Sequence, residues 1–305
     1  MKKSIKILFV FLAFSLVLTA CTQTEVSVPG EQGQDIISAE EALNIAEEEN
    51  VVLVDAQKSG DYEEQHLENA VNIGRNDFTT FGSFPNMLVS ASKFEELMGE
   101  NGISNDSKVI VYDNNDNMDA ARLMWTLHVF GHEDVQVVSG GINSLIEAGG
   151  EAESGEVEVD EVEFKAEEKN EDLIATKDEV LDYVNDPDED VVILDVRTDE
   201  EVSEGIIPGA VHINYTKNIN DDGEYRPYKD FLRIYPDEGI NPDKKVIIYC
   251  KTSIRAAQTY AALHNAGYRD IEIYDGAWIE WSSDSSLPVG NVGGAAVESN
   301  GQDGS

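Results

Sequence analysis

The sequence repeats itself along its length, and this repeat constrains the fold more than any other feature. The run Val51–Asp55 (Val-Val-Leu-Val-Asp) returns as Val191–Asp195 (Val-Val-Ile-Leu-Asp). Further matches follow in the same order: 70–73 with 210–213, 108–113 with 245–250, 131–135 with 267–271, and 139–141 with 275–277. The chain is therefore predicted to hold two copies of one domain of about 115 residues.

Within each copy, buried strands alternate with helical patterns. The strands are continuous runs of Val, Ile and Leu, and helices are predicted over residues 120–130 and 256–266, each ending before a glycine, Gly131 or Gly267. Such alternation indicates an α/β fold in which each domain is a mainly parallel sheet flanked by helices. Ligands of such sheets bind at the carboxyl ends of the strands.

Changes in composition set the predicted boundaries. Ser38, with Glu41 three residues later, resembles a capping box that opens the first helix. Residues 157–164 of the linker alternate like a short strand. The predicted segments are a signal peptide at 1–20, a tether at 21–35, the first domain at 36–150, an acidic linker at 151–172, the second domain at 173–288 and a disordered tail at 289–305.

The N-terminus carries a targeting signal. Lys2, Lys3 and Lys6 precede the uncharged apolar run Ile7–Leu18, which is typical of a signal peptide. The following Thr-Ala-Cys21 resembles a bacterial lipobox, and this resemblance implies cleavage before Cys21 and lipidation of that cysteine. We therefore expect a protein anchored by lipid to the outer side of a bacterial cell membrane. The alternative is an ordinary cleaved secretory peptide.

Composition excludes several classes of function. The formal net charge is −40, from 61 acidic and 21 basic residues, and it repels nucleic acid and anionic lipid headgroups. The five histidines have no metal-ligand spacing. The acidic runs 113–119 and 218–223 lack the glycine or glutamate of a calcium loop. We expect no metal, no cofactor and no nucleic-acid partner.

Cys250 is the candidate reactive residue. It directly follows the apolar run Lys245–Tyr249, and a short loop leads from it to Arg255 and an Ala-rich helical pattern. The N–H groups of the loop and the helix N-terminus would point at the sulfur and favour the reactive thiolate. The alternative is a buried cysteine that acts as a small hydrophobic residue. With Cys21 lipidated, Cys250 has no disulfide partner, which favours the functional interpretation.

Four segments carry a resemblance to a known family. They are Leu194–Arg197 (Leu-Asp-Val-Arg), Ile207–Val211 (Ile-Pro-Gly-Ala-Val), Tyr249–Ala256 (Tyr-Cys-Lys-Thr-Ser-Ile-Arg-Ala) and Tyr274–Trp281 (Tyr-Asp-Gly-Ala-Trp-Ile-Glu-Trp). Together they are similar to the tandem-domain rhodaneses, the thiosulfate and 3-mercaptopyruvate sulfurtransferases. The resemblance implies that Cys250 attacks a donor such as thiosulfate, forms a persulfide and passes the sulfur to a thiol or to cyanide.

The resemblance also implies roles for neighbouring residues. The loop residues Lys251, Thr252, Ser253, Ile254 and Arg255 would surround the thiolate and the persulfide, and the two cations would attract an anionic donor. The Asp195–Arg197 pair would brace the loop. In the first domain Asp113 stands in place of the cysteine, so that domain is predicted to be non-catalytic and to wall the cleft.

Some residues depart from the family pattern. Ile206 stands where the family often has histidine, and residues 198–205 are too short for the insert with a second arginine in the classical enzymes. Mercaptopyruvate is therefore a doubtful donor. The alternatives are a persulfide-carrying or redox-sensing module, and a phosphatase or arsenate reductase. The last is disfavoured because the six-residue loop from Cys250 to Arg255 has the length used for sulfur transfer.

Overall fold

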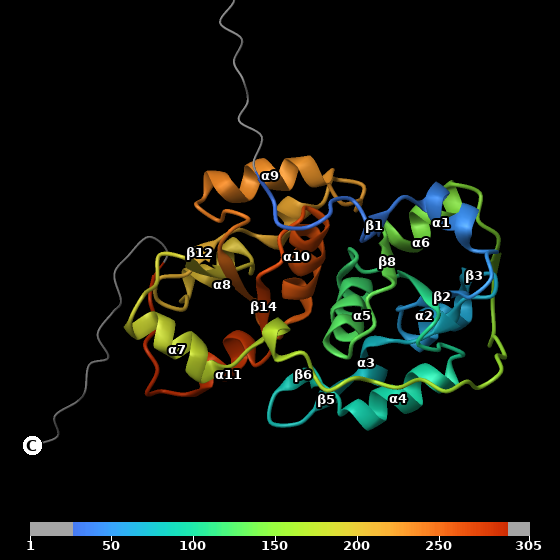
Figure 1. Ribbon diagram of the computed structural model, residues 1–305, viewed down its shortest axis with the longest axis horizontal. Helices are drawn as coiled ribbons and strands as arrows, with labels where there is room; N and C mark the ends of the chain where they lie inside the picture. The colour runs from blue at the N-terminus through green and yellow to red at the C-terminus, as the bar shows by residue number, and fades with distance from the viewer. Residues whose placement is uncertain (1–26, 292–305) are drawn as a thin grey trace, which may run out of the picture.

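The computed structural model describes residues 27–291 and contains two parallel sheets, one in each half of the chain (Figure 1). The first sheet has the order β1-β8-β7-β2-β4, and all of its pairings are parallel. Its strands are β1 (Ile36–Ile37), β2 (Val51–Asp55), β4 (Val71–Asn72), β7 (Lys108–Tyr112) and β8 (Val135–Val138).

The second sheet has the equivalent order β10-β14-β13-β11-β12 and is also fully parallel. Its strands are β10 (Ile174–Ala175), β11 (Val191–Asp195), β12 (Val211–His212), β13 (Lys245–Tyr249) and β14 (Ile271–Tyr274). Val51 pairs with Lys108 in the first sheet as Val191 pairs with Lys245 in the second. The α/β fold with two copies of one domain is confirmed, and the repeat extends to the register of the strands.

Helices cover both sheets, and two short antiparallel pairs complete the fold. The pairs are β3 (His66–Leu67) with β9 (Ala152–Glu153), and β5 (Thr79–Phe81) with β6 (Pro85–Leu88). The α-helices are α1 (Ala39–Ile45), α2 (Ser59–Glu64), α3 (Arg75–Phe78), α4 (Ala91–Glu100), α5 (Met118–Val129), α6 (Gly141–Glu147), α7 (Lys177–Asn185), α8 (Asp199–Ser203), α9 (Tyr228–Asp237), α10 (Ile254–Asn265) and α11 (Ala277–Ser283), with 3₁₀ turns at Glu171–Leu173 and Tyr215–Asn218.

The predicted helices 120–130 and 256–266 are α5 and α10, and each begins two residues earlier than predicted. These two helices pack against each other between the sheets (Figure 1). Both are buried almost throughout, which explains why apolar residues are spread around each helix rather than confined to one face. The Nδ1 atom of His128 lies 2.9 Å from the hydroxyl of Tyr260 across this interface. One hydrophobic core therefore runs through both domains.

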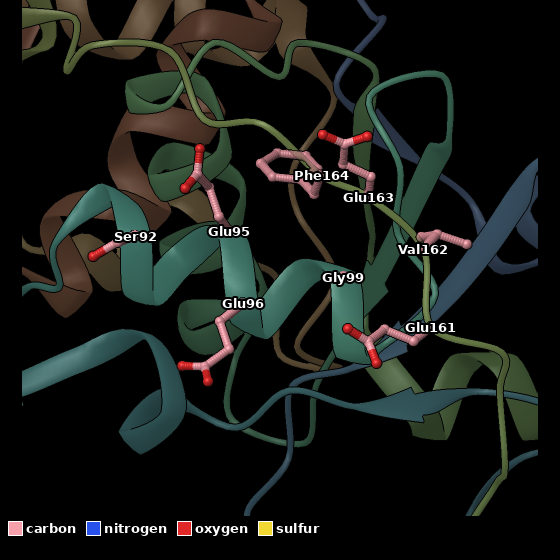
Figure 2. Close-up of a pocket in the computed structure, with 8 residues that line it drawn as sticks. All are labelled: Ser92, Glu95, Glu96, Gly99, Glu161, Val162, Glu163 and Phe164. Carbon is pink, nitrogen blue, oxygen red and sulfur yellow. The ribbon is translucent and has the colours of Figure 1, made fainter.

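The linker between the domains differs from the prediction. Residues 157–164 form no strand; they run along α4 instead, beside a groove rimmed by glutamates (Figure 2). The N–H of Val162 donates to the carbonyl of Gly99 at 3.1 Å, and a Cβ at Gly99 would lie 2.6 Å from the carbonyl oxygen of Val162. Phe164 is buried beside Phe94. Phe164 and the backbone at Val162 thus hold this segment on the helix, while the side chains of Val159 and Val162 are exposed.

The two ends of the described chain are bound to the second domain. Gly30 and Gly33, in the predicted tether, donate to the carbonyls of Gly267 and Asn265 at 2.9 and 2.8 Å. Gly290, in the predicted tail, exchanges two hydrogen bonds with Ile206. Cys21 and the predicted signal peptide lie outside the described residues. Between residues 27 and 291, no helix has the length and hydropathy needed to span a membrane.

Replacing Phe164 with alanine should lower the free energy of unfolding by about 3 kcal/mol, because the truncation leaves a cavity against Phe94 that the linker cannot refill. Urea unfolding of both proteins measures the difference. Val159→Ala on the same segment is the control, since Val159 is 43% exposed and its loss should cost under about 0.5 kcal/mol. Equal costs for the two variants would show that the linker is not anchored through Phe164.

Candidate active site

Cys250 follows β13 at the carboxyl end of the second sheet and is 1% exposed. The chain reaches α10 through only three residues, and Ser253, the last of them, adopts the left-handed conformation with φ 67°. This conformation turns the backbone sharply, so that the loop curls around the sulfur before the helix begins. The structure thus places Cys250 where the sequence predicts it.

The turn 275–279, which consists of Asp275, Gly276 and the first three residues of α11, follows β14 and binds the outer side of the cysteine loop. The N–H groups of Trp278 and Ile279 donate to the carbonyls of Cys250 and Lys251 at 2.9 and 3.2 Å. The hydroxyl of Ser253 donates to the carbonyl of Asp275 at 2.5 Å. Within residues 27–291, the N–H groups of residues 251–256 have no protein acceptor. The loop therefore holds its carbonyls outward and keeps its N–H groups available to an anion.

Arg255 is the loop residue whose positive charge interacts with Cys250. Its guanidinium forms a bidentate ion pair with Glu201, at 2.5 and 2.9 Å. Burial lowers the pKa of Arg255, but Glu201 and Cys250 outweigh burial and raise it. Burial raises the pKa of Glu201, whereas the hydrogen bond from Arg255 lowers it to about 2. The pair stays ionised at neutral pH, so Arg255 is held in place.

The sequence analysis missed Glu201. Its only local signal is the capping box it forms with Thr198 at the start of α8, which indicates a helix terminus and no partner elsewhere in the chain.

The predicted Asp195–Arg197 pair is buried beside the cysteine loop. The Nη2 atom of Arg197 lies 2.6 Å from Asp195 Oδ2 and also 2.6 Å from the carbonyl oxygen of Gly205. The guanidinium carbon of Arg197 lies 4.1 Å from the ring centre of Trp278. The backbone N–H of Trp278 donates to the carbonyl of Cys250. Arg197 contacts the turn that holds the loop, and Asp195 holds Arg197 in place, an arrangement in line with the bracing role that the resemblance implies.

The other predicted loop residues lie on different sides of the chain. Lys251 is exposed, while Thr252 is half-buried and accepts a hydrogen bond from Asn86 of the first domain at 3.0 Å. Ile254 is buried, so its side chain serves packing. Lys251 is thus the loop cation that a soluble donor can reach directly.

In the first domain, the equivalent loop surrounds an acidic side chain with its N–H groups. Asp113 occupies the position of Cys250, and its carboxylate is buried. It accepts four backbone hydrogen bonds, from Asn115 and Asn117 on one oxygen and from Asp119 and Ala120 on the other, at 2.8–3.0 Å. The loop N–H groups therefore close around a negative charge, as expected for a thiolate in the other copy.

Residues of the first domain complete the surroundings of the cysteine loop. Asn86 and Leu88 lie on the β5–β6 hairpin, and the N–H of Leu88 donates to Asp275 at 3.0 Å. Arg122, on α5, forms an ion pair with Asp275 at 2.7 Å. The sequence gives no sign of these contacts because they join distant segments. They show that the first domain forms one side of the site.

Comparison with known proteins identifies the family. The model of the rhodanese-like domain matches the chain twice, at residues 38–148 and 176–284. The chain belongs to the rhodanese family. Each match contains four of the five strands of its sheet, β2, β4, β7 and β8 in the first and β11 to β14 in the second, and Asp113 and Cys250 lie at equivalent places in them.

Individual relatives agree with this assignment. A Haloferax volcanii protein named "Putative thiosulfate sulfurtransferase" is 32% identical over 227 residues, 69% of this chain and 76% of that protein. The crystal structure of the 3-mercaptopyruvate sulfurtransferase SseA from Escherichia coli matches with a TM-score of 0.71 and 26% identity, covering 80% of this chain and 98% of SseA. The Thermus thermophilus "Sulfur carrier protein TtuD" is 28% identical over 220 residues, 66% of this chain and 77% of TtuD. This rhodanese thus belongs among sulfurtransferases.

The stability of this rhodanese should depend on the protonation of Asp113. Burial and the charge of Asp119 raise the pKa of Asp113 from 3.8 to about 6, although hydrogen bonds from backbone N–H groups act to lower it. The protonated Asp113 therefore stabilises the folded protein, and this stabilisation is fully present below pH 3.8 and is lost as the pH rises through 6. Relative to Asp113→Asn, the wild type should therefore lose up to about 3 kcal/mol of unfolding free energy over this interval.

Urea unfolding of both proteins across that interval makes the measurement. Asp55, whose pKa burial also raises to about 6, titrates in both proteins and cancels in the difference. Parallel stability curves for the two proteins would contradict the prediction.

Proposed function

We propose that this rhodanese is a sulfurtransferase that moves a sulfane sulfur from thiosulfate, or a similar anionic donor, to a thiol or cyanide through a persulfide on Cys250. The observation that carries the proposal is the loop of available N–H groups around Cys250, whose counterpart binds the Asp113 carboxylate through four such groups. A ring of donors of this kind stabilises a thiolate and an anionic persulfide alike.

The reaction has two steps. In the first, the Cys250 thiolate attacks the outer sulfur of thiosulfate, the S–S bond breaks, and sulfite leaves with the bonding electron pair. In the second, cyanide or a thiolate attacks the outer sulfur of the persulfide, and the Cys250 thiolate leaves. Arg255 balances the negative charge in both states of the cysteine, and the exposed Lys251 attracts the incoming anion. Neither step requires a proton or an external oxidant.

Two alternatives have specific support. The similarity to the sulfur carrier protein TtuD favours a module that holds the persulfide for a protein acceptor. The rhodanese fold also suits a phosphatase, but three residues between Cys250 and α10 leave a smaller loop than the four between Asp113 and α5. The lipid anchor on Cys21 and a place outside the cytoplasm stay predictions from the sequence.

Incubation with thiosulfate should add the mass of one sulfur atom to Cys250, and cyanide should then release thiocyanate over many turnovers. Cys250→Ser should reduce thiocyanate formation by at least about 10³-fold, because a hydroxyl cannot form a persulfide. Intact-mass spectrometry and a thiocyanate assay measure the two steps.

Asp113→Ala serves as the matched control in the other loop and should keep most of the turnover, since that loop carries no sulfur. A stable adduct without turnover would support the carrier instead. Activity that survives Cys250→Ser would overturn the assignment of the site.

A further inference from the structure

Asp275 joins the first domain to the turn that binds the cysteine loop. Its carboxylate accepts from the Nη2 of Arg122 at 2.7 Å and from the N–H of Leu88 at 3.0 Å. Arg122 is fully buried and Asp275 is 5% exposed. Both donors belong to the first domain, so this carboxylate is an anchor point between the two halves of the protein.

The same residue begins the turn 275–279. Its carbonyl accepts from Ser253, and the turn continues to Trp278 and Ile279, whose N–H groups bind the carbonyls of Cys250 and Lys251. Displacing Asp275 would therefore displace three hydrogen bonds that fix the loop. These contacts connect Arg122 of α5, through Asp275 and the turn that follows it, to the backbone of Cys250.

The Arg122–Asp275 ion pair contributes too little to the stability of the folded protein for stability to explain its presence. The Nε and Nη1 atoms of Arg122 are buried and have no protein hydrogen-bond partner. A buried ion pair with unsatisfied donors stabilises little, and well-packed apolar residues often do better. The guanidinium gains some attraction from the face of Trp125, 4.3 Å away. The unsatisfied donors indicate that the pair is retained for position.

The equivalent contacts on the other side are neutral. Ser139 holds the place of Asp275 in the repeat, and its hydroxyl accepts from the N–H of Tyr225 at 2.8 Å, as Asp275 accepts from Leu88. Gln258, in α10, reaches the backbone carbonyl of Asp116 in the loop of the first domain at 2.9 Å. Each domain thus holds the loop of the other, but among the described residues an ion pair that joins the two domains beside one of these loops occurs only at the loop of Cys250.

We propose that Arg122 and Asp275 are positioning residues for sulfur transfer. By fixing the turn 275–279, they keep the carbonyls of Cys250 and Lys251 outward and the loop N–H groups directed at the sulfur. The non-catalytic domain therefore sets the geometry of the nucleophile as well as walling the site. This inference rests on the proposed function of Cys250.

The test compares steady-state turnover of thiosulfate and cyanide in the wild type, Arg122→Met and Asp275→Asn. Both variants should lower kcat about tenfold, while KM for thiosulfate stays within about twofold, because loop alignment matters more in the transition state than in binding. Alkylation of Cys250 by iodoacetamide should slow by a similar factor. Arg122→Lys should restore most of the activity, since an ammonium can donate to Asp275.

Tyr260→Phe is the matched control, because it removes the buried hydrogen bond to His128 from the same domain interface. It should cost stability without changing kcat by more than about twofold. If Arg122→Met does not fold, the isosteric Asp275→Asn decides. A kcat near the wild-type value in either folded variant, or an equal loss in Tyr260→Phe, would overturn the inference. A wild type that takes up no sulfur would overturn the proposed function instead.

Discussion

The organisation of this rhodanese depends on the direction in which one short loop presents its peptide groups. A loop between a parallel strand and a helix can turn either its carbonyls or its N–H groups toward a side chain at the strand end. Here two N–H groups of the turn 275–279 donate to the outward carbonyls of Cys250 and Lys251. The N–H groups are left for the sulfur. Without these few backbone hydrogen bonds, Cys250 would be an ordinary buried thiol at the end of a strand.

Holding that turn in place has a conformational cost in the second domain. Ala277 has φ 55°, a left-handed conformation that an alanine adopts only at a cost of about 1 kcal/mol. The first domain has Gly141 at the equivalent position, with φ 60° and no such cost. The strained residue thus lies in the copy that contains Cys250, next to the N–H group of Trp278 that donates to the Cys250 carbonyl. Strain of this kind persists where surrounding contacts fix the backbone, as Asp275 and Arg197 do here.

Patterns that are local in sequence predicted most of the fold. The β-branched runs, the glycines after α5 and α10, and the in-register repeat determine two parallel sheets and place Cys250 and Asp113 at equivalent strand ends. The linker was misread because an apolar alternation looks the same whether it pairs with a strand or packs on a helix. Only the tertiary contact between Val162 and Gly99 distinguishes the two.

The sequence analysis missed the contacts that complete the site, and for a common reason. Glu201 pairs with Arg255, Asn86 with Thr252, and Arg122 with Asp275, and each pair joins residues far apart in the chain. Charge and spacing within one segment do not specify such partners. A capping glutamate, a hairpin asparagine and a helix arginine are each explained locally. The partner of Glu201 is brought to it only by the folding of the second domain, and those of Asn86 and Arg122 only by the packing of the two domains together.

The duplication gives the domain that lacks a cysteine a structural role. Each half uses its helix and its covering loop to hold the strand-end loop of the other, as Gln258 reaches Asp116 and Arg122 reaches Asp275. Because these contacts are reciprocal, removing the first domain would expose α10 and release the turn beside Cys250 together. The carboxyl group of Asp113 gives the loop of the first domain a built-in hydrogen-bond acceptor, so that this loop keeps its shape without a ligand. It can then act as a fixed support, while the N–H groups of the Cys250 loop have no protein acceptor among the described residues.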